Sequence, residues 1–197
     1  MEVGALATNC YIVVDGEDCL VIDPGDRGPS ILRKAKKLGA SISGIVLTHG
    51  HFDHTGAAGY LREQTGAKVM IGEDDAGLLV DPGWMRPFMG SDFHPITDAV
   101  FLKSGDTVTC GTTEFIVYQT PGHSPGSVSL YTLGHLFSGD LIFMEGVGRA
   151  DLPGGDPSKL AESLRRILSS LPDETKIYPG HGGFTTVAHE KAANPFL

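Results

Sequence analysis

The sequence has few cysteines, and their spacing does not suggest a metal or redox pair. Cys10, Cys19 and Cys110 are the three cysteines, and no C-x-x-C spacing joins them. We therefore expect reduced, mostly buried thiols in a reducing compartment. No charged leader with an apolar core opens the chain, and no apolar run is long enough to span a bilayer. These absences predict a cytoplasmic protein without a membrane partner.

Basic residues are also scarce, with 15 Lys and Arg against 24 Asp and Glu, which gives a formal net charge of −9. Such a charge repels phosphate at long range, and the sequence lacks the basic–aromatic interleaving of nucleic-acid-binding segments. We therefore expect no nucleic-acid partner, which argues against a non-enzymatic role of that kind. A length of 197 residues with 41% hydrophobic residues predicts one globular domain over residues 1–197. The sequence leaves the oligomeric state open.

The most informative stretch is Thr48–His54, where three histidines and one aspartate follow an apolar run that predicts a buried strand. In an extended segment, side chains two residues apart share a face, so His49 and His51 can reach one point, with Asp53 on the same side. After a turn, His54 can reach a neighbouring point. Imidazole and carboxylate groups suit zinc, iron or manganese, so we interpret the stretch as metal-binding rather than as a solvated histidine-rich loop.

Further ligands are expected in three loops that share one construction. Each loop follows an apolar run and has a glycine directly before a histidine or an aspartate, namely His123, Asp140 and His181. The glycine lets the backbone bend and place that side chain at the end of the strand. A single histidine after Pro-Gly is more often a turn residue, but three such loops beside the first motif favour metal ligation.

Two other groups of polar residues are interpreted differently. Asp23 also stands at the end of a predicted strand, and we expect it to support the metal ligands without binding the metal itself. His94, His135 and His189 have no comparable setting, and we interpret them as surface or structural residues.

Hydrophobic periodicity predicts alternating strands and helices along the chain. Strands are predicted over residues 10–14, 19–22, 44–47, 68–71, 100–102, 107–110, 114–118, 128–132, 136–138 and 176–178. Helices are predicted over residues 29–38, 56–65, 157–170 and 185–193, the third beginning at Asp156-Pro157. Residues 81–97 contain prolines and large apolar side chains without periodicity, which favours a lid or a pocket wall.

The order His-x-His-x-Asp-His, then a lone His, a lone Asp and a final His, resembles the metallo-β-lactamase superfamily. The resemblance runs from the Asn-Cys-Tyr-Ile-Val segment at residues 9–13 to the C-terminal Asn-Pro-Phe-Leu. Residues 148–156 and that C-terminal tetrapeptide resemble its glyoxalase II-like (hydroxyacylglutathione hydrolase-like) branch. The superfamily implies an α/β fold, a four-layer αβ/βα sandwich of two mixed β-sheets flanked by helices.

The same resemblance implies two divalent metal ions, with zinc expected and iron or manganese as alternatives. Carried over to this sequence, one ion is bound by His49, His51 and His123, the other by Asp53, His54 and His181, and Asp140 bridges both.

Such a pair of ions can hold a bridging hydroxide at neutral pH and polarise a carbonyl oxygen. The resemblance therefore implies a thioesterase acting on a small-molecule, acyl-glutathione-like thioester, with Asp53 orienting the hydroxide or taking up its proton. Glyoxalase II enzymes carry a further C-terminal helical domain with basic glutathione contacts. This sequence stops at Leu197, so glutathione must be held otherwise or is not the thiol. Arg149 is a candidate contact to an anionic substrate group, although a structural salt bridge is an equally good interpretation.

Two alternatives remain at this point. The persulfide dioxygenase family is similar to this sequence throughout. Such an enzyme would hold one iron through two histidines and one carboxylate, here His49, His123 and Asp140. Another hydrolase of the same fold, a β-lactamase included, is the second alternative.

Overall fold

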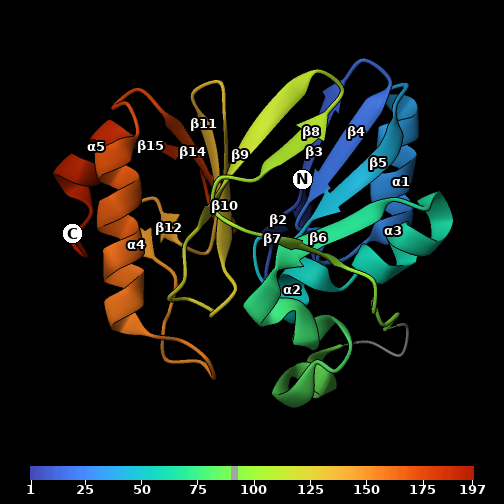
Figure 1. Cartoon of the computed structure of the whole chain (residues 1–197), viewed down its shortest axis with the longest axis horizontal. Coiled ribbons are helices and arrows are strands. Elements are labelled where there is room, and N and C mark those ends of the chain that lie inside the picture. The colour runs from blue at the N-terminus through green and yellow to red at the C-terminus, as the bar shows by residue number, and fades with distance from the viewer. Residues whose placement is uncertain (90–92) are drawn as a thin grey trace.

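Two β-sheets face each other in the middle of the molecule, and helices cover their outer sides (Figure 1). The structure is a computed structural model that describes residues 1–89 and 93–197. The first sheet is mixed and consists, in spatial order, of β3 (Tyr11–Asp15), β4 (Asp18–Ile22), β5 (Ser41–Val46), β6 (Lys68–Gly72) and β7 (Val100–Leu102). Only the β3–β4 pair in it is antiparallel.

The second sheet is built by the later half of the chain. In spatial order it consists of β15 (Thr185–Thr186), β14 (Lys176–Pro179), β11 (His135–Gly139), β10 (Val128–Thr132), β9 (Thr113–Gln119) and β8 (Thr107–Cys110). It is also mixed, because β11 and β14 run parallel while its other neighbours are antiparallel. Two small hairpins complete the strands, β1 (Glu2–Val3) with β2 (Thr8–Asn9) and β12 (Ile142–Phe143) with β13 (Gly146–Val147).

Helices lie on both outer sides of the sheets. The first sheet is covered by α1 (Gly28–Lys37) and α3 (Ala58–Thr65), and the second by α4 (Pro157–Ser170) and α5 (Val187–Ala193) (Figure 1). Asp156 caps α4 by accepting hydrogen bonds from the backbone N–H groups of Ser158 and Lys159, as its position before Pro157 predicts. The short helix α2 (Phe52–Thr55) and two 3-10 helices, Glu73–Leu79 and Gly83–Phe88, lie near the sheet edge.

Strand β4 shows why the core has three layers of apolar packing. Side chains alternate across a strand, so Cys19 and Val21 pack under the helices of the first sheet. Leu20 and Ile22 point the other way and pack between the sheets, against residues such as Phe115. A third cluster lies between the second sheet and α4. The predicted four-layer α/β sandwich is therefore confirmed.

Two of the predicted helices have different boundaries in the structure. The helix predicted over residues 56–65 begins only at Ala58, as α3, and Gly56 and Ala57 separate it from the preceding short helix α2. A Cβ atom at Gly56 would lie 2.3 Å from the carbonyl oxygen of Gly25, so this close approach requires glycine. The helix predicted over residues 185–193 begins only at Val187, because the two residues before it form β15.

The remaining elements agree with the sequence prediction to within a few residues. The strands predicted over residues 100–102, 107–110 and 128–132 have the same bounds in the structure. The segment 81–97 contains the 3-10 helix Gly83–Phe88, while residues 90–92 of that prediction lie outside the described residues. No helix in the described ranges is long and apolar enough to cross a membrane.

Candidate metal centre and substrate pocket

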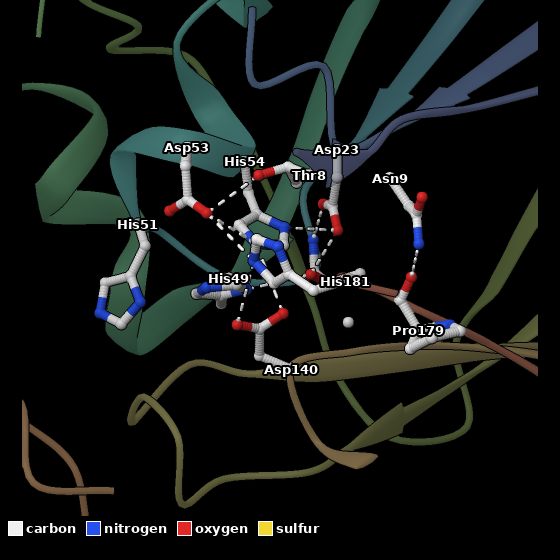
Figure 2. Close-up of polar contacts among 12 residues, drawn as sticks. Thr8, Asn9, Asp23, His49, His51, Asp53, His54, Asp140, Pro179 and His181 are labelled. Atoms are coloured by element: carbon white, nitrogen blue, oxygen red, sulfur yellow. Dashed lines mark hydrogen bonds and ion pairs between the residues drawn. The ribbon is translucent and has the colours of Figure 1, made fainter. Parts of the chain in front are cut away.

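The strands of both sheets deliver their polar side chains to one shared edge (Figure 2). Asp23 follows β4, and the motif that begins at Thr48 follows β5. From the second sheet, His123, Asp140 and His181 follow β9, β11 and β14, respectively. Segments far apart in sequence therefore meet at a single site, as the contact between His54 and His181 across 127 residues shows.

Three histidines form the first group of ligand atoms at this edge. Nδ1 of His51 lies 2.9 Å from Nε2 of His123, which in turn lies 3.2 Å from Nε2 of His49. All three side chains are buried. Their nitrogen atoms lie within 4.8 Å of one another, which is close enough for one cation to bind all three.

A second group lies beside the first and combines one carboxylate with two imidazoles. Oδ2 of Asp53 lies 3.2 Å from Nε2 of His181 and 3.4 Å from Nε2 of His54. The carboxylate of Asp140 contacts both groups, with Oδ1 at 3.4 Å from Nε2 of His54 and Oδ2 at 3.5 Å from Nε2 of His123. The structure therefore brings all seven predicted ligands together.

The local path of the motif differs from the sequence prediction in one respect. The chain is extended at His51, with φ −70° and ψ 147°, but α2 begins at the next residue. Asp53 and His54 therefore lie on one helical turn, and both side chains belong to the second group. The expectation that Asp53 shares a side with His49 and His51 was wrong, because a strand periodicity was applied to residues that form a helix.

Hydrogen bonds on the far side of the rings fix which nitrogen carries the proton. Nδ1 of His54 lies 2.9 Å from Oδ2 of Asp23, and the Thr48 hydroxyl also donates to that oxygen at 2.7 Å. Because the Thr48 hydrogen points at Asp23, its oxygen can accept from Nδ1 of His49 at 3.1 Å. These contacts direct the Nε2 atoms of both histidines at the site. Asp23 therefore occupies the supporting position that the sequence suggested.

The N-terminal hairpin supports the last ligand loop in a similar way (Figure 2). The backbone N–H of Asn9 donates to the carbonyl of Gly180 at 2.7 Å, and its side-chain amide donates to the carbonyl of Pro179 at 3.1 Å. Nδ1 of His181 donates to the carbonyl of Leu6 at 3.1 Å, which directs its Nε2 atom at the second group. In the first group, Nδ1 of His123 likewise donates to a carbonyl, that of residue 149, at 2.7 Å.

The electrostatics of the two groups differ. Burial and the neighbouring His123 lower the pKa of His51 to about 3, and burial also holds the pKa of His49 well below its ordinary value. For His54, burial alone lowers the pKa, but the carboxylates of Asp140 and Asp23 outweigh it and raise the pKa to about 10. The first group therefore offers neutral lone pairs, whereas the second is a region of negative charge that attracts a positive ion.

Asp53 is ionised in this setting. Burial alone would raise its pKa, but hydrogen bonds from His181 and Thr8, together with the charge of His54, hold it below the ordinary value. The Thr8 hydroxyl donates to Oδ2 of Asp53 at 3.0 Å. No local sequence pattern points to Thr8, because its contact depends on the small N-terminal hairpin.

Two glycines beside the ligands have physical reasons to be glycine. Gly139, directly before Asp140, has φ +52°, a left-handed conformation that disfavours side chains with a Cβ atom. A Cβ atom at Gly180 would lie 2.1 Å from Oδ1 of Asp140 and 2.7 Å from Cε1 of His54. The glycine before Asp140 is therefore required by the backbone conformation. The glycine before His181 is required by the lack of space for a Cβ atom.

A buried carboxylate that was not predicted from the sequence joins two ligand loops. Asp75 lies in the 3-10 helix after β6, and its Oδ2 accepts from the N–H of Gly50 at 2.8 Å and from the hydroxyl of Ser124 at 2.6 Å. Its Oδ1 accepts from the N–H of Gly126 at 2.7 Å. An acidic run directly after an apolar strand was the available signal.

A pocket of about 550 Å³ opens beside the ligands. Trp84 and Phe88 line it, so the described part of segment 81–97 forms a pocket wall. The Trp84 ring centroid lies 6.0 Å from that of His51, and Phe88 stacks on Phe52 with centroids 5.3 Å apart. Arg149 also lines this pocket, but its guanidinium forms a bidentate pair with Asp151 at 2.7 and 2.8 Å. Its predicted contact to a substrate stays a prediction.

The three other histidines lie outside the centre. His94 contacts Glu63, His135 contacts the hydroxyl of Tyr178, and His189 contacts Glu145.

The residues present fit a divalent cation. Oδ1 of Asp140 is buried and has no hydrogen-bond partner within the described residues, although it faces the ligand atoms. Four of the five rings direct their Nδ1 atoms to oxygen atoms outside the centre, so their Nε2 atoms converge on one another and, in the neutral rings, are acceptors that face acceptors. Buried acceptors that face each other without donors are stable only with a positive group between them.

Comparisons with known proteins agree with this geometry. A model of the metallo-beta-lactamase superfamily matches residues 3–181. Hydroxyacylglutathione hydrolase GloC of Haemophilus influenzae is 32% identical over 203 residues, which covers 100% of this chain and 96% of that protein.

Solved structures extend the similarity to three dimensions. The di-iron-bound form of TTHA1623 is 40% identical with a TM-score of 0.90, covering 100% of this chain and 98% of that chain. The B3 metallo-beta-lactamase BLEG-1 is 34% identical with a TM-score of 0.91, covering 99% of this chain and 96% of that chain.

Proposed function

The chain belongs to the metallo-beta-lactamase superfamily and is a metallo-hydrolase, and from that premise we propose that it cleaves an acyl-glutathione-like thioester with two bound divalent cations. The observation that carries the proposal is the convergence of the ligand atoms on one point, with the Nδ1 atoms of four of the five rings hydrogen-bonded on the outer side. The similarity to a hydroxyacylglutathione hydrolase over the whole chain supports the thioester as substrate.

The proposed ligand sets follow the two groups of side chains. One cation would be held by His49, His51 and His123, the other by Asp53, His54 and His181, and Asp140 would contact both. Zinc is the expected ion for imidazole and carboxylate ligands, and the di-iron form of TTHA1623 makes iron the first alternative. When bound, such cations supply a water that loses its proton near neutral pH, and they polarise a carbonyl oxygen.

Residues of the chain itself position the reacting groups. Within the described residues, the polar contacts of Asp53 all use Oδ2. Its Oδ1 is therefore the oxygen that can orient a water in the pocket and accept its proton. A thiolate, whose conjugate acid has a pKa near about 8.5, leaves without a proton donor. This suits a pocket that is mostly apolar beyond the proposed metal ligands.

The test begins with protein purified without added metal. Mass spectrometry should find two divalent ions per chain, and thiol release from S-lactoylglutathione should stop on chelation and return when zinc is added. A protein that carries both ions and releases no thiol from any thioester would contradict the thioesterase. Nitrocefin hydrolysis, measured in parallel, tests β-lactamase activity because of the similarity to BLEG-1.

A persulfide dioxygenase is the second candidate. It would use one iron held by His49, His123 and Asp140, and the distances of 3.2 Å between the two Nε2 atoms and 3.5 Å from His123 to Asp140 are compatible with this set. One iron per chain, with oxygen uptake in the presence of glutathione persulfide, would favour this activity over hydrolysis.

A further inference from the structure

The pocket beside the proposed metal ligands has apolar walls from both halves of the chain. Phe52, Trp84 and Phe88 come from the first half, and Phe143, Val147 and Leu152 come from the second. The aromatic contacts begin at the ligands themselves, because Trp84 packs against His51 and the Phe143 ring lies 6.0 Å from that of His181. A substrate carbonyl at the ligands therefore has an apolar surface directly beside it.

Two of these side chains remain accessible to solvent. Trp84 is 41% exposed and Phe88 is 60% exposed, although both lie at the pocket and not on a remote surface. An apolar group that packs between them removes its own surface and theirs from water. Exposed aromatic side chains around a concave site are a frequent feature of ligand-binding pockets.

The charges of the pocket do not favour an anionic substrate. Among the described residues that line it, Arg149 is the one side chain with a permanent positive charge. Its side chain is 63% exposed, and its guanidinium is already paired with Asp151. The chain as a whole has a net charge of −9. The carboxylates of a thiol such as glutathione therefore meet little attraction from the protein side chains here.

On the premise that the enzyme hydrolyses thioesters, we propose that it selects its substrate by a bulky apolar acyl group, aromatic or branched, packed against Trp84, Phe88 and Phe143. The charge of the thiol carrier contributes little to selection. The acyl group occupies the apolar pocket next to the ligands, and the carrier extends toward solvent past the paired Arg149.

Trp84 makes the proposal testable without turnover, because it is the single tryptophan of the chain. Its fluorescence in the metal-loaded wild type is titrated with three stable thioethers: S-benzylglutathione, S-benzyl-N-acetylcysteamine and S-methylglutathione. The two benzyl compounds should bind within about threefold of each other, and the methyl compound at least about tenfold more weakly. Equal binding of the benzyl and methyl compounds, or binding only of those with a glutathione carrier, would overturn the proposal.

Phe88→Ala tests the wall directly. It should weaken binding of both benzyl thioethers about tenfold while changing that of S-methylglutathione by less than about threefold. Phe101→Ala is the matched control, because Phe101 is 48% exposed on β7 and does not line the pocket. A Phe88→Ala protein that binds the benzyl compounds as the wild type does would also contradict the proposed packing.

Rates of thioester cleavage distinguish the proposed selection for apolar acyl groups from the proposed hydrolysis itself. The kcat/KM for the phenylacetyl thioester of N-acetylcysteamine should exceed that for the acetyl thioester at least about tenfold. Equal kcat/KM values would overturn apolar selection and leave hydrolysis standing. Tight binding of benzyl thioethers without cleavage of any thioester would overturn hydrolysis and leave the pocket preference standing.

Discussion

The carboxylate of Asp75 accepts a hydrogen bond of 2.6 Å from the hydroxyl of Ser124, and this buried contact joins two loops that supply ligands of the first group. The same carboxylate accepts from the N–H groups of Gly50 and Gly126. Gly50 separates His49 from His51, and Ser124 follows His123 directly. Asp75 therefore fixes the relative positions of the three histidines of the first group, although it is not one of the proposed metal ligands.

Replacing Asp75 tests this connection. Asp75→Ala leaves two buried backbone N–H groups without acceptors, and each such group costs about 1–3 kcal/mol. We expect the free energy of unfolding in urea to fall by about 2–4 kcal/mol, with weaker metal binding in a chelator titration. Asp74→Ala is the control, since Asp74 is exposed in the same 3-10 helix. Equal stability of both variants would show that the contact has no structural role.

Removing one ligand of the second group should remove one ion. His54→Ala and His181→Ala should each keep one metal per chain and lose hydrolysis at least about tenfold. Metal content by mass spectrometry and thiol release measure the two effects. His189→Ala is a suitable control, because this histidine is exposed and contacts Glu145 on the surface. Full activity in both ligand variants would mean that a single metal suffices.

Gly180 offers a test of space at the centre. In Gly180→Ala the new methyl group would lie 2.1 Å from Oδ1 of Asp140, so the carboxylate must move out of its place. We expect loss of metal and of hydrolysis, with a far-ultraviolet circular dichroism spectrum like that of the wild type. Gly77→Ala provides the comparison, because a Cβ atom there meets nothing within 4 Å. Metal content equal to that of the wild type would contradict the crowding.

The hydrogen bonds of Asp15 predict that the stability of the fold depends on pH. Its Oδ2 accepts hydrogen bonds from the backbone and hydroxyl groups of Thr112 and Thr113, which connect the two sheets. Those from Thr112 lower its pKa most. Because the pKa is lower in the folded state, the contribution to stability is complete above the unfolded pKa, about 3.9, and is lost as the pH falls through the folded value.

Urea midpoints between pH 2 and 6 test that prediction. Asp15→Asn should lower stability at pH 6 and flatten its dependence on acid, so that the two proteins converge at low pH. Glu17→Gln removes a charge from the same turn without removing the contacts to Thr112 and is the control. Parallel curves for wild type and Asp15→Asn would show that this carboxylate does not link acid to stability.

The sequence sufficed for the features that depend on neighbouring residues. Strands such as β10 and the helix capped by Asp156 follow from local patterns, and Gly before His123 or Asp140 indicated ligand loops. The resemblance to a known superfamily supplied the two-layered sheet arrangement and the pairing of ligands. The parallel contact between β11 and β14 could not be derived locally, because its strands are separated by α4.

The features that could not be predicted from the sequence depend mostly on contacts between distant segments. Asp75 reaches Gly126 across 51 residues, and Thr8 reaches Asp53 across 45. Two-residue strands such as β1 and β2 are too short to show any periodicity. The helical turn at Asp53 was missed because a strand pattern was extended beyond His51, the last extended residue.

Anomalous diffraction from crystals of the zinc-loaded protein tests the central claim most directly. Two anomalous peaks are expected, one within bonding distance of His49, His51 and His123 and the other within bonding distance of Asp53, His54 and His181, with Asp140 touching both. Peaks elsewhere, or no peak at this edge of the sheets, would contradict the account.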